Sequence, residues 1–347
     1  MTEEKKQKPS WLSYLIKYGV PLLITIGLCY LLFSRIDFNE MVEIIRRDCN
    51  FTYIGIALVV SIFSHVFRGF RWGIQLRALG ITPPKWVLVL SIFGTYAVNL
   101  VFPRLGEVWR TGWISERQKA PFTTVFGSMV ADRLADTVMV ALLIIVTFFL
   151  ASGQLMSYLS QNTSSYDKLV AFVSSPWLWA GLVAFVALAW FLVWRFRETA
   201  LIQKCKKILV ELWDGFAVIV KMKGKFQWIL LSLAIWGCYF FQLYVAFFAF
   251  PVTADVVATY GWVAVLVCFV LSSISMGVPS NGGIGPWQWA IIFGLSLYPV
   301  PGLTEEYATS FANLVMGCQT LLLILLGIFT FVVISINKKL TSKTPTA

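Results

Sequence analysis

Long apolar runs recur along the whole chain, and they limit its fold more than any other feature. Several approach the ~20 residues that a helix needs to cross the hydrocarbon core, and there are too many for one signal anchor. Only 13% of the residues are charged, about half the share usual in soluble domains. We therefore predict an all-α polytopic membrane protein. The runs are residues 14–33, 51–70, 86–102, 121–150, 177–194, 227–250, 260–278, 287–298 and 307–335.

Basic residues gather in particular connecting segments, and this distribution predicts which segments face the cytoplasm. The net charge of +11 therefore indicates membrane orientation and contact with anionic inner-leaflet lipids, and not nucleic acid. Both termini are predicted to be cytoplasmic. The predicted cytoplasmic segments are residues 1–13, 71–85, 195–226 and 336–347, and the predicted outer segments, poor in Lys and Arg, are residues 151–176, 251–259 and 299–306.

Counting crossings between the basic loops exposes one irregular segment. Three apolar runs separate residues 71–85 from residues 195–226, and three full crossings would put these two loops on opposite sides. One run must enter and return. We assign this role to residues 86–102, which end in the charged, helix-breaking sequence NLVFPRLGEVWR. The prediction is a re-entrant hairpin near residues 86–120, buried in protein or lining a wet cavity.

A second interruption lies in the sequence SMGVPSNGGIGPWQWA, where Gly and Pro separate two apolar runs. Two full spans or a hairpin near residues 260–298 both leave the C-terminus cytoplasmic, so both stay open, and we favour the hairpin. Two broken segments in corresponding halves are typical of inverted-repeat transporters.

The domain prediction is a single transmembrane domain over residues 1–347, with six to eight spanning helices and one or two hairpins. A retained first helix over residues 14–33 opens it, because no small-residue cleavage site follows that run. The two halves are residues 14–194 and 227–335, joined by residues 195–226, which form a basic amphipathic helix on the inner leaflet.

The first hairpin holds the candidate substrate-binding residues Asn99, Arg104, Glu107 and Arg110. If a helix resumes near Leu105, Glu107 and Arg110 share a face and form an ion pair that could hold the hairpin or receive a phosphate. The alternative is an ordinary cytoplasmic loop with a solvated pair.

Three more charges, Asp132, Arg133 and Asp136, lie inside an apolar run. A charge at the bilayer centre costs about 2.5 to 3.5 kcal/mol, so these side chains should face the bundle interior and pair. One reading is a structural clamp from either aspartate to Arg104 or Arg110. The other is a polar path for a lipid headgroup or a proton relay.

The glycines of the second interruption could bring backbone amides to the start of a short helix, which is a ready anion site. The alternative is that they permit close packing or act as a hinge. Ser280 and Asn281 could add polar contacts. The candidate binding residues here are Ser280, Asn281, Gly282, Gly283, Gly285 and Gln288.

Three residues at the end of the second run are given simpler roles. Arg68 and Arg71 are predicted to snorkel to cytoplasmic headgroups, and His65 to pack. No metal, cofactor or catalytic residue is predicted, because the six cysteines are scattered, His65 is the single histidine, and no Walker A or GxSxG motif occurs.

Four stretches resemble the transmembrane region of the lysylphosphatidylglycerol synthase and flippase family, in the order expected for that family. They are RWGIQLRALG (71–80), NLVFPRLGEVWR (99–110), DRLAD (132–136) and VPSNGGIG (278–285). The resemblance implies that Asn99, Pro103, Arg104, Gly106, Glu107, Arg110, Arg133, Asp136, Gly282, Gly283 and Gly285 are the motif positions.

Two departures qualify this resemblance. Gln288 stands where the family commonly has Glu, which removes a charge that could read a cationic headgroup. The chain also ends shortly after its last apolar run, so we expect it to lack the aminoacyl-transfer domain and do not infer synthase activity.

The resemblance implies a multi-pass protein of the bacterial inner membrane that moves an aminoacylated phospholipid or a lipid-linked substrate between leaflets. An enzyme is less favoured, and the alternatives are a membrane-embedded enzyme acting on a lipid phosphate or lipid-linked sugar, and an accessory subunit. The partners considered are the lipid substrate, anionic inner-leaflet lipids, a second copy of the chain and a soluble lipid-modifying enzyme.

Overall fold

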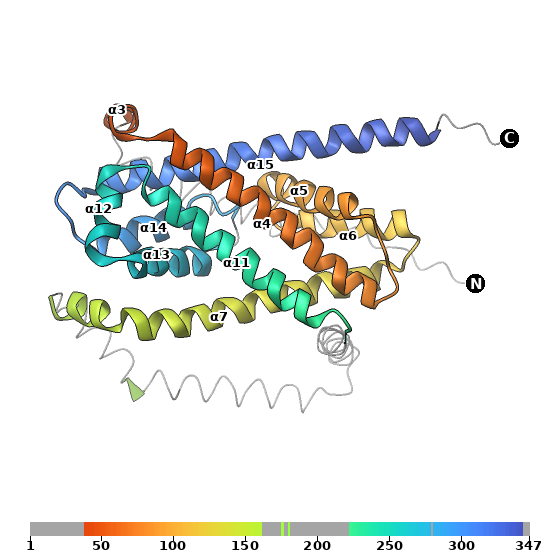
Figure 1. Cartoon of the computed structure of the whole chain (residues 1–347), viewed down its shortest axis with the longest axis horizontal. Coiled ribbons are helices and arrows are strands. Elements are labelled where there is room, and N and C mark those ends of the chain that lie inside the picture. The colour runs from red at the N-terminus through yellow and green to blue at the C-terminus, as the bar shows by residue number, and fades with distance from the viewer. Residues whose placement is uncertain (1–37, 162–174, 177–179, 181–221, 279, 343–347) are drawn as a thin grey trace.

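The computed structural model describes residues 38–161, 175–176, 180, 222–278 and 280–342, and over these ranges every regular element is a helix (Figure 1). The all-α prediction is therefore confirmed for the described chain. Several predicted elements lie outside the described residues. They are the N-terminus at 1–13, the first helix at 14–33, the run at 177–194, the amphipathic linker except residues 222–226, and the last residues of the C-terminal tail.

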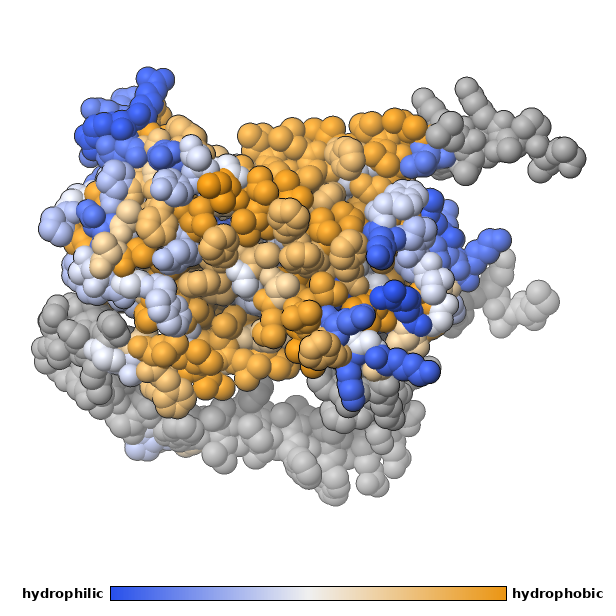
Figure 2. Space-filling model, viewed as in Figure 1, coloured by the Kyte–Doolittle hydropathy of each residue, from blue (hydrophilic) through white to orange (hydrophobic). Residues whose placement is uncertain are grey.

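Four described helices are long and apolar enough to cross a bilayer, and a bent pair could form a fifth span. Figure 2 shows apolar residues across the middle of the visible face and hydrophilic residues gathered at its two ends, as a membrane-spanning bundle requires. The four helices are α4 (Phe51–Ala78), α7 (Phe122–Gln161), α11 (Lys225–Phe247) and α15 (Glu305–Ser342), and the bent pair is α12 (Pro251–Tyr260) and α13 (Trp262–Ser275), which meet at 111°.

Two helices extend the predicted pattern. The helix α7 continues to Gln161, past the apolar run that ends at residue 150, and the helix α12 forms within the segment that was predicted to lie on the outer side. α12 forms because Pro251 takes the first helical position, where its missing N–H costs nothing. The Thr253 hydroxyl supports this start by donating to the carbonyls of Phe247 and Phe250.

The predicted reversal in the first half is present as a pair of short helices, α5 (Lys85–Val101) and α6 (Leu105–Gln118). Pro103 disfavours helical geometry at the residue before it, and Phe102 is indeed extended. Arg104 then adopts a left-handed conformation with φ of 60°, which turns the chain back. Gly106 lies so close to the Thr95 carbonyl that no side chain would fit, so the two helices pack in antiparallel contact.

The second interruption is also a hairpin, formed by α13 and α14 (Pro286–Ser296). These helices have 14 and 11 residues, about 21 and 17 Å at 1.5 Å per residue, so neither crosses the ~30 Å hydrocarbon core alone. Gly294 packs against Cys268, which brings the two helices into antiparallel contact. These lengths are those that the favoured hairpin for residues 260–298 requires, and the choice between the hairpin and two full spans stays a prediction.

The two hairpins enter the bundle from opposite ends and meet at their tips (Figure 1). The Arg104 guanidinium donates a hydrogen bond of 3.2 Å to the Gly277 carbonyl. Leu100 packs on Gly282, where an added Cβ would come within 2.6 Å of the leucine side chain. Laid end to end, α5 and α13 measure about 46 Å, close to the ~40 to 45 Å of a bilayer with its headgroups. The contact between the tips therefore lies well inside the length of the bundle, far from the other ends of both hairpins.

Two apolar cores hold these hairpins in place. The larger joins α11, α13, α14 and α15 around Phe247, Ile291 and Phe311, and the short helix α3 (Phe38–Asp48) adds Ile44 to it. The smaller joins α4, α5, α6 and α7 around Trp72 and Ile114. The first hairpin is thus fixed against α4 and α7. These two helices carry the buried side chains of Arg68, Arg71 and Asp132.

Candidate functional site

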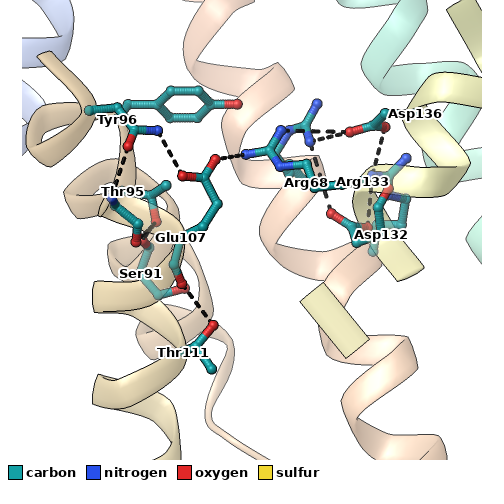
Figure 3. A network of polar contacts seen from close by, with 12 residues as sticks. Arg68, Ser91, Thr95, Tyr96, Glu107, Thr111, Asp132, Arg133 and Asp136 are labelled. Carbon is teal, nitrogen blue, oxygen red and sulfur yellow. Dashed lines mark hydrogen bonds and ion pairs between the residues drawn. The ribbon is translucent and has the colours of Figure 1, made fainter. Parts of the chain in front are cut away.

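Charged side chains from α4, α6 and α7 gather beside the first hairpin, and we call this group the charged cluster. Figure 3 shows most of its members pointing toward one another from separate helices. Two of its residues come from each of α4 and α6 and three from α7. The charged cluster consists of Arg68, Arg71, Glu107, Arg110, Asp132, Arg133 and Asp136.

The centre of the charged cluster is a set of crossed ion pairs between two arginines and two aspartates. Arg71 lies 2.7 Å from Asp132 and 2.8 Å from Asp136, and Arg68 lies 2.6 Å from Asp136 and 3.9 Å from Asp132. Each pair occupies one face of its helix, because the arginines are three residues apart and the aspartates four. α4 and α7 are therefore joined by matched charges.

The predicted positions of these arginines are wrong. Arg68 and Arg71 do not reach the membrane surface, because their exposures are 3% and 0%. The apolar run ends at residue 70, but α4 continues to Ala78, so Arg71 lies about 10 Å before the end of the helix. Buried arginines require anionic partners, and the aspartates of α7 provide them. The predicted clamp from these aspartates to Arg104 or Arg110 is accordingly wrong.

Glu107 links the hairpin to α7 (Figure 3). It accepts a hydrogen bond of 2.6 Å from Arg133 and one of 3.2 Å from the Asn99 amide. The Asn99 side-chain oxygen in turn accepts from the Gly106 backbone N–H at 2.8 Å, which satisfies one amide at the start of α6. Glu107 is thus engaged by Arg133 and not by Arg110, so the predicted pair within α6 is wrong. Arg133 also lies 3.8 Å from Asp136, three residues further along α7.

Arg110 is fully buried, and none of its three guanidinium nitrogens has a hydrogen-bond partner in the described protein. Its guanidinium lies over the Trp72 ring at 4.4 Å, a cation–π contact. Gln75, one turn further along α4 and 2% exposed, also has both amide atoms without a partner. Buried polar groups are nearly always paired, so these unpaired groups call for a physical explanation.

Two tyrosines extend the charged cluster on the side of α11. The Tyr239 hydroxyl accepts from Arg68 at 3.2 and 3.3 Å, and it lies 3.4 Å from the Tyr96 hydroxyl. His65 packs on Tyr96 with ring centroids 4.5 Å apart, in agreement with its predicted packing role. The sequence reasoning missed Arg68, Arg71 and both tyrosines as members of the site. One sequence signal could have indicated the arginines. Arg68 and Arg71 are three residues apart at the end of an apolar run, and Asp132 and Asp136 are four apart in another, so each pair shares one helix face.

Arg104 lies apart from the charged cluster, at the tip of the first hairpin. It is exposed, and its guanidinium donates to the Gly277 carbonyl of the second hairpin. Apolar residues surround it at the surface, because Val101, Phe102 and Met276 are 64%, 46% and 49% exposed. The tip region is therefore an apolar surface that carries the Arg104 guanidinium.

The candidate residues of the second hairpin form a separate group. Gly282, Gly283 and Gly285 all have positive φ, as a turn of this kind requires. The Gly285 N–H donates at 2.6 Å to the Gln288 side chain, which in turn donates to Asn313 on α15. Gln288 is thus a helix cap, and it occupies the amide that could have bound an anion.

The other two candidates of this loop are near its tip. The Ser280 hydroxyl donates to the Val278 carbonyl at 3.4 Å, and Asn281 accepts from the Ile284 N–H at its backbone carbonyl. Gly277 and Gly282 link this loop to the first hairpin at the tips. Among the described residues, no group of three or more His, Cys, Asp and Glu could hold a metal ion.

These features define a class: a polytopic helical membrane protein in which two opposed hairpins meet beside a buried set of charges. The chain belongs to the family described as the lysylphosphatidylglycerol synthase transmembrane region, whose family model matches residues 19–327. This confirms the resemblance inferred from the four sequence motifs.

Two curated relatives match parts of the chain. One is the glycosyltransferase AglD of Haloferax volcanii, 30% identical over 121 residues, which are 35% of this chain and 19% of the relative. The other is the UPF0104 membrane protein MJ1595 of Methanocaldococcus jannaschii, 22% identical over 143 residues, 40% of this chain and 42% of the relative. The chain thus matches less than half the length of either relative. No solved structure matches the chain.

Proposed function

We propose that this protein moves the headgroup of a phospholipid, aminoacylated or not, or of a lipid-linked substrate, between the leaflets of a membrane. The observation that carries the proposal is the exposed guanidinium of Arg104 where the two hairpin tips meet. A lipid has to take its polar headgroup through hydrocarbon, and an opposite charge halfway lowers the free energy of that passage.

Arg104 is too deep to reach water by snorkelling. The helix α5 places it about 25 Å from the end of the hairpin at Lys85, and the arginine side chain extends only a fraction of that length. An arginine at the bilayer centre costs about 2.5 to 3.5 kcal/mol on the insertion scale. A phosphate group that passes along the tip region would offset that cost, which supports Arg104 as a headgroup contact.

The remaining predicted residues receive roles from their positions. Arg110 is proposed as a second phosphate contact, and Glu107, Asp132 and Asp136 balance the arginine charges around it. The glycine loop of the second hairpin forms the other wall at the tips, with Ser280 and Asn281 near the junction.

The proposal also assigns the orientation of the protein in the membrane. Arg77, Lys85, Lys119 and Lys225 all lie at the ends of helices that converge at one end of the bundle, on the right in Figure 1, where the described part of α15 also ends. The positive-inside rule assigns that end to the cytoplasm, where it would meet anionic lipids. We propose a bacterial inner-membrane location with both termini on this side.

The test is lipid movement in proteoliposomes that contain the full chain. Arg104→Asn removes the charge while Asn tolerates the left-handed backbone at this position. We expect this variant to move labelled anionic phospholipid about tenfold or more slowly, because a charge-assisted contact contributes about 1.5 to 3 kcal/mol. Arg117→Asn, an exposed arginine of the same hairpin, is the control and should behave as the wild type. Wild-type movement no faster than in empty vesicles would refute the proposal, and an unaffected Arg104→Asn would refute the site.

The second candidate function is a membrane-embedded enzyme acting on a lipid phosphate or lipid-linked sugar. The similarity to a protein named as a glycosyltransferase favours it. This candidate needs Asp132 or Asp136 as acid or base, but both carboxylates are engaged by Arg68 and Arg71. Product formation from labelled lipid in detergent would support the enzyme. Co-purification with a stoichiometric soluble enzyme would support an accessory subunit instead. Co-purification of a second copy of the chain would indicate an oligomer.

A further inference from the structure

The charged cluster has an odd number of charges, and its sum is not zero. Its basic members are Arg68, Arg71, Arg110 and Arg133, and its acidic members are Glu107, Asp132 and Asp136. With the carboxylates ionised in their ion pairs, the charged cluster carries one surplus positive charge. Arginine does not deprotonate in proteins, so this surplus persists unless an anion joins the group.

The structure assigns the surplus to one residue. Arg68, Arg71 and Arg133 each lie within 2.8 Å of a carboxylate oxygen, whereas Arg110 has no ion pair among the described residues. The side chain of Arg110 is fully buried, with unpaired nitrogens. A buried charge without a partner is strongly unfavourable, and the cation–π contact with Trp72 offsets that cost only in part.

A second unpaired group lies on the helix face that Arg110 contacts. Trp72 and Gln75 are three residues apart on α4 and so share one face. The Gln75 amide is 2% exposed and has a donor and an acceptor without partners. A guanidinium and an amide on facing helices are donors that suit the oxygens of one oxyanion.

We propose that an oxyanion of one negative charge binds between α4 and α6 at Arg110 and Gln75, and that the charged cluster selects such monoanions over neutral and doubly charged species. A phosphodiester brings one charge, which neutralises the group, whereas a phosphate monoester brings about −1.5 to −2 and leaves a new unpaired charge. The source of the monoanion is a lipid headgroup or a free anion. This inference deepens the proposed function. It relies on that function only for the expectation that a lipid headgroup enters the site.

The test is ligand-induced thermal stabilisation of the full chain in detergent. The lipid probes share short acyl chains and differ in headgroup: phosphatidylglycerol with one charge, phosphatidylcholine with none and phosphatidic acid with more than one. Sodium nitrate and sodium sulfate at equal ionic strength are the free mono- and dianions. We expect wild type to bind phosphatidylglycerol about tenfold or more tightly than phosphatidylcholine. Stabilisation by the lipid alone identifies a headgroup, and equal stabilisation by nitrate identifies a free anion.

Two variants change the charge count in opposite directions. Arg110→Gln brings the sum to zero, so the preference for phosphatidylglycerol over phosphatidylcholine should disappear. Glu107→Gln raises the surplus to two, so the preference should move to phosphatidic acid and to sulfate. Arg117→Gln, on the same helix but exposed and outside the charged cluster, should keep the wild-type order.

Either variant can overturn the inference. It fails if Arg110→Gln keeps the phosphatidylglycerol preference, or if Glu107→Gln ranks the headgroups as wild type does. Should Arg110→Gln not fold, Glu107→Gln alone decides. Because binding is measured in detergent, the result is independent of transport. Lipid movement without charge selection removes only this inference, and charge selection without lipid movement removes only the proposed function.

Discussion

Arg71→Met is the most direct test of the charged cluster. Arg71 is fully buried, and it lies 2.7 and 2.8 Å from the carboxylates of Asp132 and Asp136. The substitution keeps the volume and apolar stem but leaves the fully buried Asp132 with Arg68 at 3.9 Å as its remaining cation. Removing one partner of a buried pair costs about 3 to 5 kcal/mol, mainly because the other charge stays buried without compensation. We expect a loss of that size in the free energy of unfolding.

The measurement is reversible unfolding of the purified protein in detergent, followed by tryptophan fluorescence. The matched control is Arg77→Met, which removes an exposed arginine from the same helix and should change the free energy of unfolding by about 0.5 kcal/mol or less. The double variant Arg71→Met with Asp132→Leu removes both charges of one pair. It should recover most of the loss, since replacing a buried ion pair with apolar residues is often neutral or stabilising.

The reasoning is refuted if Arg71→Met loses no more stability than Arg77→Met. It is also refuted if the double variant is as unstable as the single one, because the loss would then come from packing and not from an uncompensated carboxylate.

Two further predictions concern the hairpins. Gly106→Ala should destabilise the protein by about 1 to 3 kcal/mol in thermal unfolding, because its Cβ would overlap the Thr95 carbonyl, whereas Gly112→Ala, with open space around it, should not. Gly282→Ala should destabilise the protein, because its Cβ would come within 2.6 Å of the Leu100 side chain and its φ is 64°, and adding Leu100→Ala should recover part of the loss; strictly additive losses would contradict the contact between the tips.

The hairpins were predictable because their signals are local. Pro103 and the charges that follow it cannot continue a membrane helix, and the loop charges fix the number of crossings. The glycines at 282–285 mark the second reversal in the same way, since their backbone conformations exclude most other residues. Such constraints involve neighbours in the sequence, so no knowledge of the tertiary fold is needed.

The pairing of charges was not predictable in the same way. Arg71 looks like a surface residue when the apolar run is taken to end at residue 70, and only the approach of α7 makes it an interior one. Glu107 and Arg110 are correctly spaced for a pair, yet Arg133 from another helix takes the carboxylate. Partner choice depends on which helices pack together, and spacing within one helix does not contain that information.

The end-to-end arrangement of the hairpins makes their junction sensitive to the thickness of the surrounding bilayer. A continuous helix accommodates hydrophobic mismatch by tilting. Two half-length elements can instead separate or press together, and here the hydrogen bond of Arg104 and the contact of Leu100 with Gly282 join their tips. We therefore expect acyl-chain length in the host membrane to act on this protein where the two hairpin tips meet.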